Sequence, residues 1–273
     1  MAKGTERPRA ARPKAVREEG PPALRREGDR KADIVARDLI AQIASGAIPV
    51  GSLLPKEAEL AARYEVNRGV IREAVKLLEV HRLAKPVRRR GTVVLEPLHS
   101  MSPEVLVAML VPRPGHVDRR VLSAFLEVRA LLDVEMTVLA AERRTQADLK
   151  AMRAELAGLA AVTIDPRAYA AAVTRLPLLV AHATKNPVFE MLAAFNGRVI
   201  GELDAIAIAT RPPSREHVEG LGVLIDVIES KDQDAARKMV TAFHTWSIPK
   251  ILASAALASA APPVPVPTRR SPR

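Results

Sequence analysis

Residues 67 to 76, NRGVIREAVK, combine cationic and apolar side chains at helical spacing. At 100° per residue, one side of a helix over residues 68 to 80 is apolar, formed by Val70, Ile71, Ala74, Leu77 and Leu78. The opposite side carries Arg68, Gly69, Arg72 and Lys76, and Asn67 stands where the N-cap would be. Because a planar guanidinium can bond O6 and N7 of guanine together, this cationic side has the chemistry to read bases in a major groove.

A second cationic group, Arg88-Arg89-Arg90-Gly91, lies between two short stretches that predict strands near 83 to 87 and 92 to 95. The strands would form a hairpin with three arginines at its tip. A folded chain gains little from three adjacent like charges on a tight turn, whereas DNA phosphates or a narrow minor groove attract them. The tip is therefore predicted to contact DNA.

The elements that must position these groups are also visible. Residues 57 to 64 predict a helix that buries Leu60 and Ala61, and residues 65 to 67 form a short connection to the cationic helix. Two helices joined in this way, followed by the hairpin, predict a winged helix-turn-helix. We expect Asn67 to cap the second helix, and its side chain also has the reach to bond a phosphate.

About 65 residues of this segment resemble the GntR family of bacterial transcription regulators. The family pattern occurs in one register, as Gly46 and Gly51, Leu54-Pro55-Lys56-Glu57, Leu60-Ala61, Val66-Asn67-Arg68, Arg72-Glu73-Ala74, Leu78 and Gly91-Thr92-Val93-Val94. The resemblance implies that Arg68 and Arg72 contact bases and phosphates, and that Arg90 with Gly91 enters the minor groove. Asn67 stands where the family has Ser or Thr, so the half-site sequence cannot be carried over. An alternative for Arg72 is an ion pair with Glu79 or Glu65.

The charge is unevenly distributed, which fits one polyanion-binding domain. The formal net charge is +11, and residues 31 to 97 hold twelve Lys and Arg against eight Asp and Glu. Residues 98 to 260 hold eighteen of each. We assign residues 31–97 to the DNA-binding domain and 102–257 to a second domain, with a disordered basic arm at 1–30 and a disordered Pro/Arg tail at 258–273.

The chain contains no cysteine, so neither disulfides nor thiolate metal sites can form. The sequence has no apolar run of membrane-spanning length, and its first residues lack the apolar core of a signal peptide. We therefore expect a cytoplasmic protein that does not interact with membranes.

Residues after Ser102 show helical periodicity throughout, so the predicted fold is mainly α with β structure only in the wing. The spacing predicts an all-helical bundle with helices near 103–111, 118–143, 146–162, 166–183, 187–209, 214–230 and 232–253. This region resembles the effector domain, called FCD, of the FadR branch of the GntR family. The resemblance rests on Leu126-Glu127-Val128-Arg129, Ala140-Ala141, the segment 181–189 with Asn186-Pro187, and Ile225-Asp226-Val227-Ile228 with Asp232. A different helical effector domain remains the alternative.

Many FCD domains hold a divalent metal with one Asp and three His. Aligned on Asn186-Pro187 and Asp232, the four ligand positions are occupied here by Val173, Pro177, Leu221 and Ala242. None of these can ligate a metal, so we expect neither a metal nor another cofactor. His182, His217 and His244 lie on three predicted helices and are the alternative ligands of a rebuilt site, although the register places His182 and His244 on other helical faces than the family's ligands. His217 is expected to be a capping or surface residue.

Without the metal, a different ligand chemistry is needed. Arg129 interrupts an apolar stripe and is the first candidate for holding an anionic effector; the alternative is an ion pair with Glu127 or Asp133. Arg198 is the second candidate. FadR members without the metal bind an acyl-coenzyme A thioester, which the resemblance makes one alternative for this apolar interior.

No sequence signature of an enzyme is present: the chain has no Gly-rich phosphate loop, no Ser/His/Asp arrangement and no paired-carboxylate motif. We therefore expect a homodimeric regulator that binds a pseudo-palindromic DNA operator and responds to an unknown small-molecule effector. The alternative is a ligand-independent architectural DNA-binding protein that uses the helical domain only to dimerise.

Overall fold

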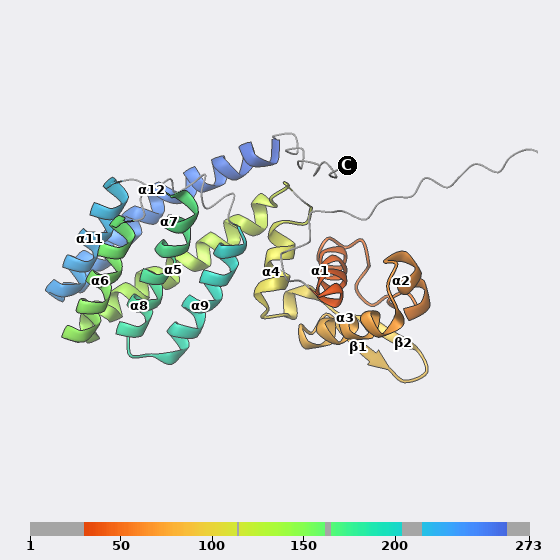
Figure 1. Ribbon diagram of the computed structural model, residues 1–273. Helices are drawn as coiled ribbons and strands as arrows, with labels where there is room; N and C mark the ends of the chain where they lie inside the picture. The colour runs from red at the N-terminus through yellow and green to blue at the C-terminus, as the bar shows by residue number, and fades with distance from the viewer. Residues whose placement is uncertain (1–29, 114, 162–164, 204–214, 261–273) are drawn as a thin grey trace, which may run out of the picture.

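The computed structural model describes residues 30–113, 115–161, 165–203 and 215–260. Figure 1 shows a small N-terminal unit beside a larger helical bundle, with α4 between them. The N-terminal unit consists of α1 (Lys31–Ala44), α2 (Glu57–Arg63), α3 (Arg68–Val80), β1 (Ala84–Val87) and β2 (Gly91–Val94). The mainly helical fold with a small two-stranded sheet agrees with the prediction.

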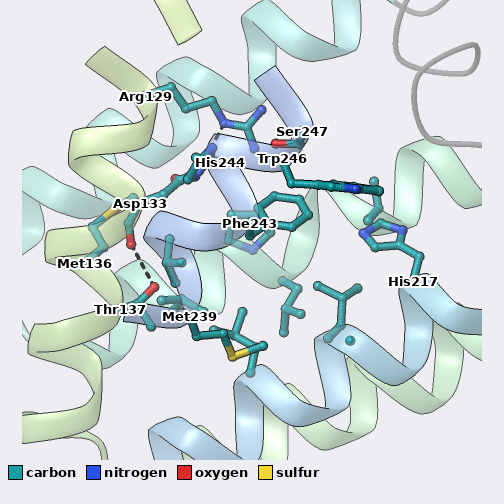
Figure 2. Close-up of a pocket in the computed structure, with 18 of the residues that line it drawn as sticks. Arg129, Asp133, Met136, Thr137, His217, Met239, Phe243, His244, Trp246 and Ser247 are labelled. Carbon is teal, nitrogen blue, oxygen red and sulfur yellow. Dashed lines mark hydrogen bonds and ion pairs between the residues drawn. The ribbon is translucent and has the colours of Figure 1, made fainter. Parts of the chain in front are cut away.

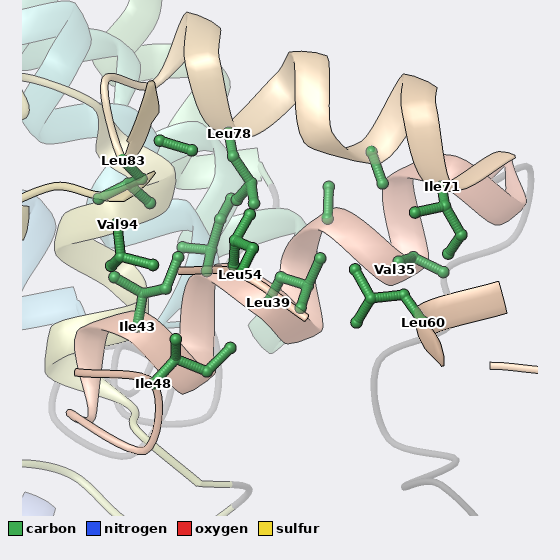
Figure 3. Close-up of a cluster of buried hydrophobic side chains, with 14 of the residues drawn as sticks. Val35, Leu39, Ile43, Ile48, Leu54, Leu60, Ile71, Leu78, Leu83 and Val94 are labelled. Carbon is green, nitrogen blue, oxygen red and sulfur yellow. The ribbon is translucent and has the colours of Figure 1, made fainter. Parts of the chain in front are cut away.

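The N-terminal unit is held by one apolar core (Figure 3). Leu39 and Ile43 from α1 meet Ile71 and Leu78 from α3, and all four are buried. Leu60 from α2 is also buried in this cluster, as the sequence predicts. Because α3 uses its apolar side to fill the core, its cationic side is left facing solvent.

A polar contact that the sequence did not reveal joins α1 to the end of α2. The Tyr64 hydroxyl donates to Asp38 Oδ2 at 2.5 Å, and Gln42 Nε2 donates to the same oxygen at 2.7 Å. Burial of the phenol, followed by its hydrogen bond to Asp38, raises the pKa of Tyr64 well above its ordinary value. The phenol therefore stays protonated and remains a donor that fixes α2 against α1.

β1 and β2 pair antiparallel, with Ala84 opposite Val94 and Val87 opposite Gly91. The strands lie within one residue of the predicted limits. Arg89 has φ of 62° and Gly91 has φ of 113°, so the turn requires two residues in the left-handed region. Glycine adopts such a φ without steric cost, which explains Gly91 at the end of the turn.

A short 3-10 helix, η2 (Pro97–His99), and α4 (Pro103–Leu110) lead into the bundle. The bundle contains α5 (Arg119–Arg143), α6 (Gln146–Ala161), α7 (Pro166–Val173), α8 (Arg175–Ala183), α9 (Pro187–Glu202), α11 (Arg215–Ser230) and α12 (Gln233–Ala260). The long helices α5 and α12 lie along each other (Figure 1). None of the helices within the described ranges combines the length and apolarity needed to cross a membrane.

Two predicted helices differ from the structure in their limits, and a third extends into residues that the structure does not describe. The helix predicted at 166–183 is divided at Thr174 into α7 and α8. α12 continues to Ala260 instead of ending at 253, because its last turns are rich in alanine, the strongest helix former. The predicted helix 187–209 is observed to Glu202, and residues 204–214 lie outside the described residues, as do 1–29 and 261–273 of the predicted arms.

A buried carboxylate joins α6 to the end of α8. Asp148 accepts hydrogen bonds from the backbone N and Oγ1 of Thr145, each at 2.7 Å. Lys185 Nζ donates to both carboxylate oxygens, at 2.8 and 2.7 Å. Burial alone would raise the pKa of Asp148, but the hydrogen bonds from Lys185 and Thr145 outweigh it and lower the pKa to about 2.

We expect Asp148→Asn to lower the free energy of unfolding on the order of 2 kcal/mol at pH 7. The folded pKa lies below the unfolded value, so the stabilisation is present above about pH 4 and is lost as the pH falls through 2. Urea unfolding at pH 7 and at pH 3 measures this: the difference from the parent should narrow at pH 3. Asp226→Asn, which alters an exposed carboxylate paired with Arg153, is the control with little expected effect. An equal loss for both variants at pH 7 would contradict the assignment.

Candidate DNA-binding surface and effector cavity

The predicted DNA-contacting residues of α3 lie on its exposed side. Asn67, Arg68, Gly69, Arg72 and Lys76 are all exposed. Asn67 is the N-cap, since its Oδ1 accepts a hydrogen bond from the Val70 amide at 3.0 Å. A Cβ at position 69 would lie 3.1 Å from this Oδ1, so glycine leaves the cap uncrowded. The backbone at the start of α3 is thereby open for close approach of another molecule.

Arg72 forms an ion pair, but with a different carboxylate from the two that its sequence neighbourhood suggested. Its Nε donates to Glu57 Oε2 at 2.8 Å, and neither Glu79 nor Glu65 is the partner. α2 crosses the first turns of α3, which brings Glu57 closer than the carboxylates flanking α3 in sequence. Both side chains are exposed, so the pair contributes little to stability and can open when a DNA base competes for the guanidinium.

The remaining cations of this surface are unpaired. Across the described ranges, no carboxylate forms an ion pair with Arg68, Lys76 or the wing residues Arg88, Arg89 and Arg90. All five side chains are exposed, and Figure 1 shows the hairpin beside α3. Exposed cations left without internal partners remain free to bind phosphates.

The bundle contains a cavity of about 440 Å³ that α5, α7, α8, α11 and α12 enclose (Figure 2). Its volume falls in the range of small-molecule sites. The walls are mostly apolar and include Met136, Leu176, Val180, Leu224, Met239, Phe243 and Ile251. Exposed Trp246 lies at the rim, with Lys250 Nζ 3.8 Å from the centre of its ring.

Polar side chains gather at one end of the cavity. Arg129 is 7% exposed, and its Nε lies 3.3 Å from Asp133 Oδ2. The same oxygen is 3.1 Å from His244 Nε2. Ser247 is 6% exposed, and its hydroxyl has no hydrogen-bond partner. The sequence identified Arg129 and its alternative partner Asp133, but it did not identify Ser247, which one turn of α12 separates from His244.

Three of the four positions inferred for the family's metal ligands lie in this cavity. Val173, Pro177 and Leu221 line it, whereas Ala242 is on the exposed side of α12. The alignment that placed the fourth ligand position at Ala242 is therefore wrong, because this residue does not line the cavity. His244 occupies the cavity-facing side of α12 instead, because two residues of helix change the direction of a side chain by about 200°.

The three histidines considered for a rebuilt metal site are separated. His182 is exposed and lies 3.2 Å from Glu190, His217 Nδ1 lies 2.7 Å from the Tyr169 hydroxyl, and His244 faces Asp133. Of the residues that the structure describes, no three His, Asp or Glu side chains are grouped as a metal site requires. His217 also lines the cavity and is half-buried, which corrects its expected role as a cap or surface residue.

Arg198 does not belong to the cavity. Its Nη2 donates to Glu104 Oε1 at 2.8 Å, and its side chain is exposed. The other oxygen of Glu104 accepts from Ser102 Oγ at 2.6 Å, which in turn lies 2.9 Å from Nδ1 of His81 at the end of α3. Arg198 is thus part of a polar connection between α9 and the C-terminal end of α3, and its prediction as a ligand-binding residue does not fit the cavity.

Comparisons with known proteins agree with both parts of the chain. Residues 31–94 match the model of bacterial regulatory proteins of the gntR family, and residues 124–244 match the FCD domain. The galactonate operon transcriptional repressor of Escherichia coli is 29% identical over 211 residues, which cover 76% of this chain and 91% of the repressor. An uncharacterised HTH-type transcriptional regulator of Mycobacterium tuberculosis is 31% identical over 183 residues, covering 65% of this chain and 72% of the relative.

A solved structure described as "Lar controls the expression of the Listeria monocytogenes agr system and mediates virulence" shares the fold. Its TM-score is 0.58 at 15% identity, over 85% of this chain and 99% of that chain. The winged helix-turn-helix, the helical bundle and the two family models lead to one assignment. The chain belongs to the GntR family of bacterial transcription regulators and carries an FCD effector domain.

Proposed function

We propose that this protein is a sequence-specific repressor that binds a pseudo-palindromic operator as a homodimer. The observation that carries the proposal is the surface formed by α3 and the wing, where Arg68, Lys76 and three wing arginines are exposed and unpaired within the described residues. An α-helix with such side chains fits a major groove, and an arginine-tipped wing fits the adjacent minor groove. Repression, rather than activation, is supported by the name of the E. coli relative.

The dimer follows from what one recognition helix can read. A single α3 contacts one half-site. Two DNA-binding domains related by a twofold axis contact two half-sites that lie about one turn of the DNA helix apart. Residues 31–97 would then form the DNA-binding domain, and 102–257 the dimerising effector domain. Residues 1–30 and 258–273 are basic segments that would add affinity for any DNA sequence.

A small molecule in the bundle cavity is the proposed signal. The cavity has the volume of a ligand site and contains a buried guanidinium, Arg129, and a buried hydroxyl, Ser247, that has no hydrogen-bond partner. The E. coli relative takes its name from an operon for galactonate, a sugar acid. The apolar walls here favour a less polar ligand than a sugar acid. A purely architectural DNA-binding protein has no use for such a cavity and is the alternative.

DNase footprinting upstream of the protein's own gene and its neighbours tests the proposal. We expect a protected region with two related half-sites about 10 base pairs apart, centre to centre. Light scattering of the free protein should give the mass of two chains. A single-chain mass together with protection that does not depend on DNA sequence would overturn the proposal in favour of an architectural role.

A further inference from the structure

We propose that the bundle cavity binds a hydrophobic monocarboxylate directly, with the carboxylate held by Arg129 and Ser247 and no metal between protein and ligand. The proposal rests on the proposed function only in regarding this cavity as the effector site. It names the ligand class from the buried groups that the cavity leaves unsatisfied. Figure 2 shows the Arg129 guanidinium and the Ser247 hydroxyl at the same end of the cavity.

Arg129 supplies a buried cation with free donors. Its Nε faces Asp133, and within the described part of the chain no acceptor bonds its two Nη groups. The residue is only 7% exposed and lines the cavity, so a ligand in the cavity is the partner best placed to accept from these groups. Two parallel N–H groups match the two oxygens of a carboxylate, so an organic acid is the ligand that satisfies them best.

Ser247 supplies a second donor from the opposite helix. Its hydroxyl is buried and has no partner, although serine in a helix ordinarily bonds a carbonyl one turn earlier. An unsatisfied buried hydroxyl is unfavourable, so a ligand oxygen that accepts from it removes a cost that the free protein carries. Arg129 from α5 and Ser247 from α12 therefore bring donors from two helices to the same end of the cavity.

The surroundings limit the ligand to one negative charge. Among the lining residues that the structure describes, Arg129 is the only buried Lys or Arg, so this end of the cavity has no further cation for a second carboxylate. A second carboxylate would lie among Leu176, Val180 and other apolar side chains, where an unpaired charge is costly. The same walls require an apolar body, and a polyhydroxylated acid would leave its hydroxyls without partners.

The cavity rim disfavours the acyl-coenzyme A alternative. A coenzyme A moiety carries several phosphate charges, which need basic side chains at the opening. Among the lining residues that the structure describes, the exposed charged side chains are Lys250, placed over the Trp246 ring, and Glu216. A volume of about 440 Å³ also suits a free acid of medium length better than a thioester of coenzyme A.

The test is calorimetric titration of the full chain, after dialysis against EDTA, with octanoate, 1-octanol, octanedioate and gluconate. We expect octanoate to bind with at least about tenfold higher affinity than each of the other three, because only octanoate offers one carboxylate and an apolar body. Octanoate should also raise the Tm, since it binds the folded state alone. Unchanged binding in EDTA shows that no metal mediates the contact.

Two variants locate the carboxylate. Arg129→Met should weaken octanoate binding by about tenfold to a hundredfold while leaving octanol binding unchanged. Because this variant breaks a buried ion pair with Asp133, its Tm and its octanol binding are measured as controls for folding. Ser247→Ala, which removes a hydroxyl that bonds nothing, should keep the parent's Tm without ligand and weaken octanoate by about fivefold. Arg120→Gln, an exposed position on the same helix as Arg129, is the control that should change neither value.

The outcomes separate this inference from the proposed function. Octanoate affinity that both cavity variants retain, octanol or gluconate binding as tightly as octanoate, or binding that EDTA abolishes would each overturn the carboxylate site. The operator footprint of the parent, measured without octanoate, tests DNA recognition independently. A normal footprint with no octanoate binding would reject the ligand class alone, and octanoate binding without a footprint would reject the regulator alone.

Discussion

Replacing Arg88, Arg89 and Arg90 together by alanine is expected to weaken binding to every DNA sequence and to flatten its salt dependence. All three side chains are exposed at the tip of the β1–β2 hairpin and lack ion-pair partners among the described residues. Each phosphate contact contributes about 0.9 to the slope of log K against log salt, so the loss of three lowers the slope by roughly 2.7. The affinity ratio of parent to variant should then fall about 40-fold between 50 and 200 mM salt.

Fluorescence anisotropy with an operator duplex and an unrelated duplex, over a salt series, measures both quantities. The control removes three charges from exposed positions of the effector domain, by changing Arg120, Lys150 and Lys238 to alanine. Both variants have the same net charge, so only the wing variant should change the slope by more than about one unit. A slope as steep as the parent's in the wing variant would mean that the wing does not touch DNA.

The DNA-binding domain, residues 31–97, could be predicted closely from the sequence because the patterns that identify its elements are local. The apolar spacing of α3, the N-cap at Asn67 and the hairpin around Gly91 each depend on residues within about ten positions of one another. The partner of Arg72 was missed for the opposite reason. Glu57 is fifteen residues away, and only the crossing of α2 over α3 brings the two charges together.

The bundle cavity could be predicted less completely, because its walls come from five helices. Arg129 was visible as one charged residue on an apolar stripe, and its neighbour Asp133 lies one turn further along α5. Ser247 and Arg198 show what the sequence lacks. A serine gives no sign that its hydroxyl is unsatisfied, and an arginine gives no sign that it reaches Glu104 on another helix. Such facts depend on helix packing, which pattern and spacing do not specify.

The division of the helix predicted at 166–183 illustrates the same limit. Its apolar periodicity continues across Thr174, so the pattern alone predicts one element. In the structure α7 ends at Val173 and α8 begins at Arg175, which lets both helices line the cavity. The wrong register at Ala242 has another origin, because it was counted from Asp232 along α12, which is continuous from Gln233 to Ala260.

Arg72→Ala is expected to remove specific operator binding and leave the fold intact. The arginine is exposed on the outer side of α3, and the base contacts of such a residue contribute about 1–3 kcal/mol, or about 5- to 150-fold in affinity. Its exposed ion pair with Glu57 contributes little to folding, so the Tm should stay close to the parent's. Anisotropy with operator and unrelated DNA, together with thermal unfolding, measures the two effects separately.

Two companion variants assign the role of the guanidinium. Arg72→Lys keeps the charge but loses the planar fork, so it should retain binding to unrelated DNA and lose most of the preference for the operator. Glu57→Gln releases Arg72 and removes a negative charge beside the DNA-binding surface, so affinity should rise for both duplexes. If instead Arg72→Ala leaves the operator footprint unchanged, or if Arg72→Lys keeps the parent's preference for the operator, the prediction that Arg72 recognises bases is wrong. Specificity would then have to come from Asn67, Arg68 or Lys76, the other exposed polar side chains predicted to contact DNA from α3.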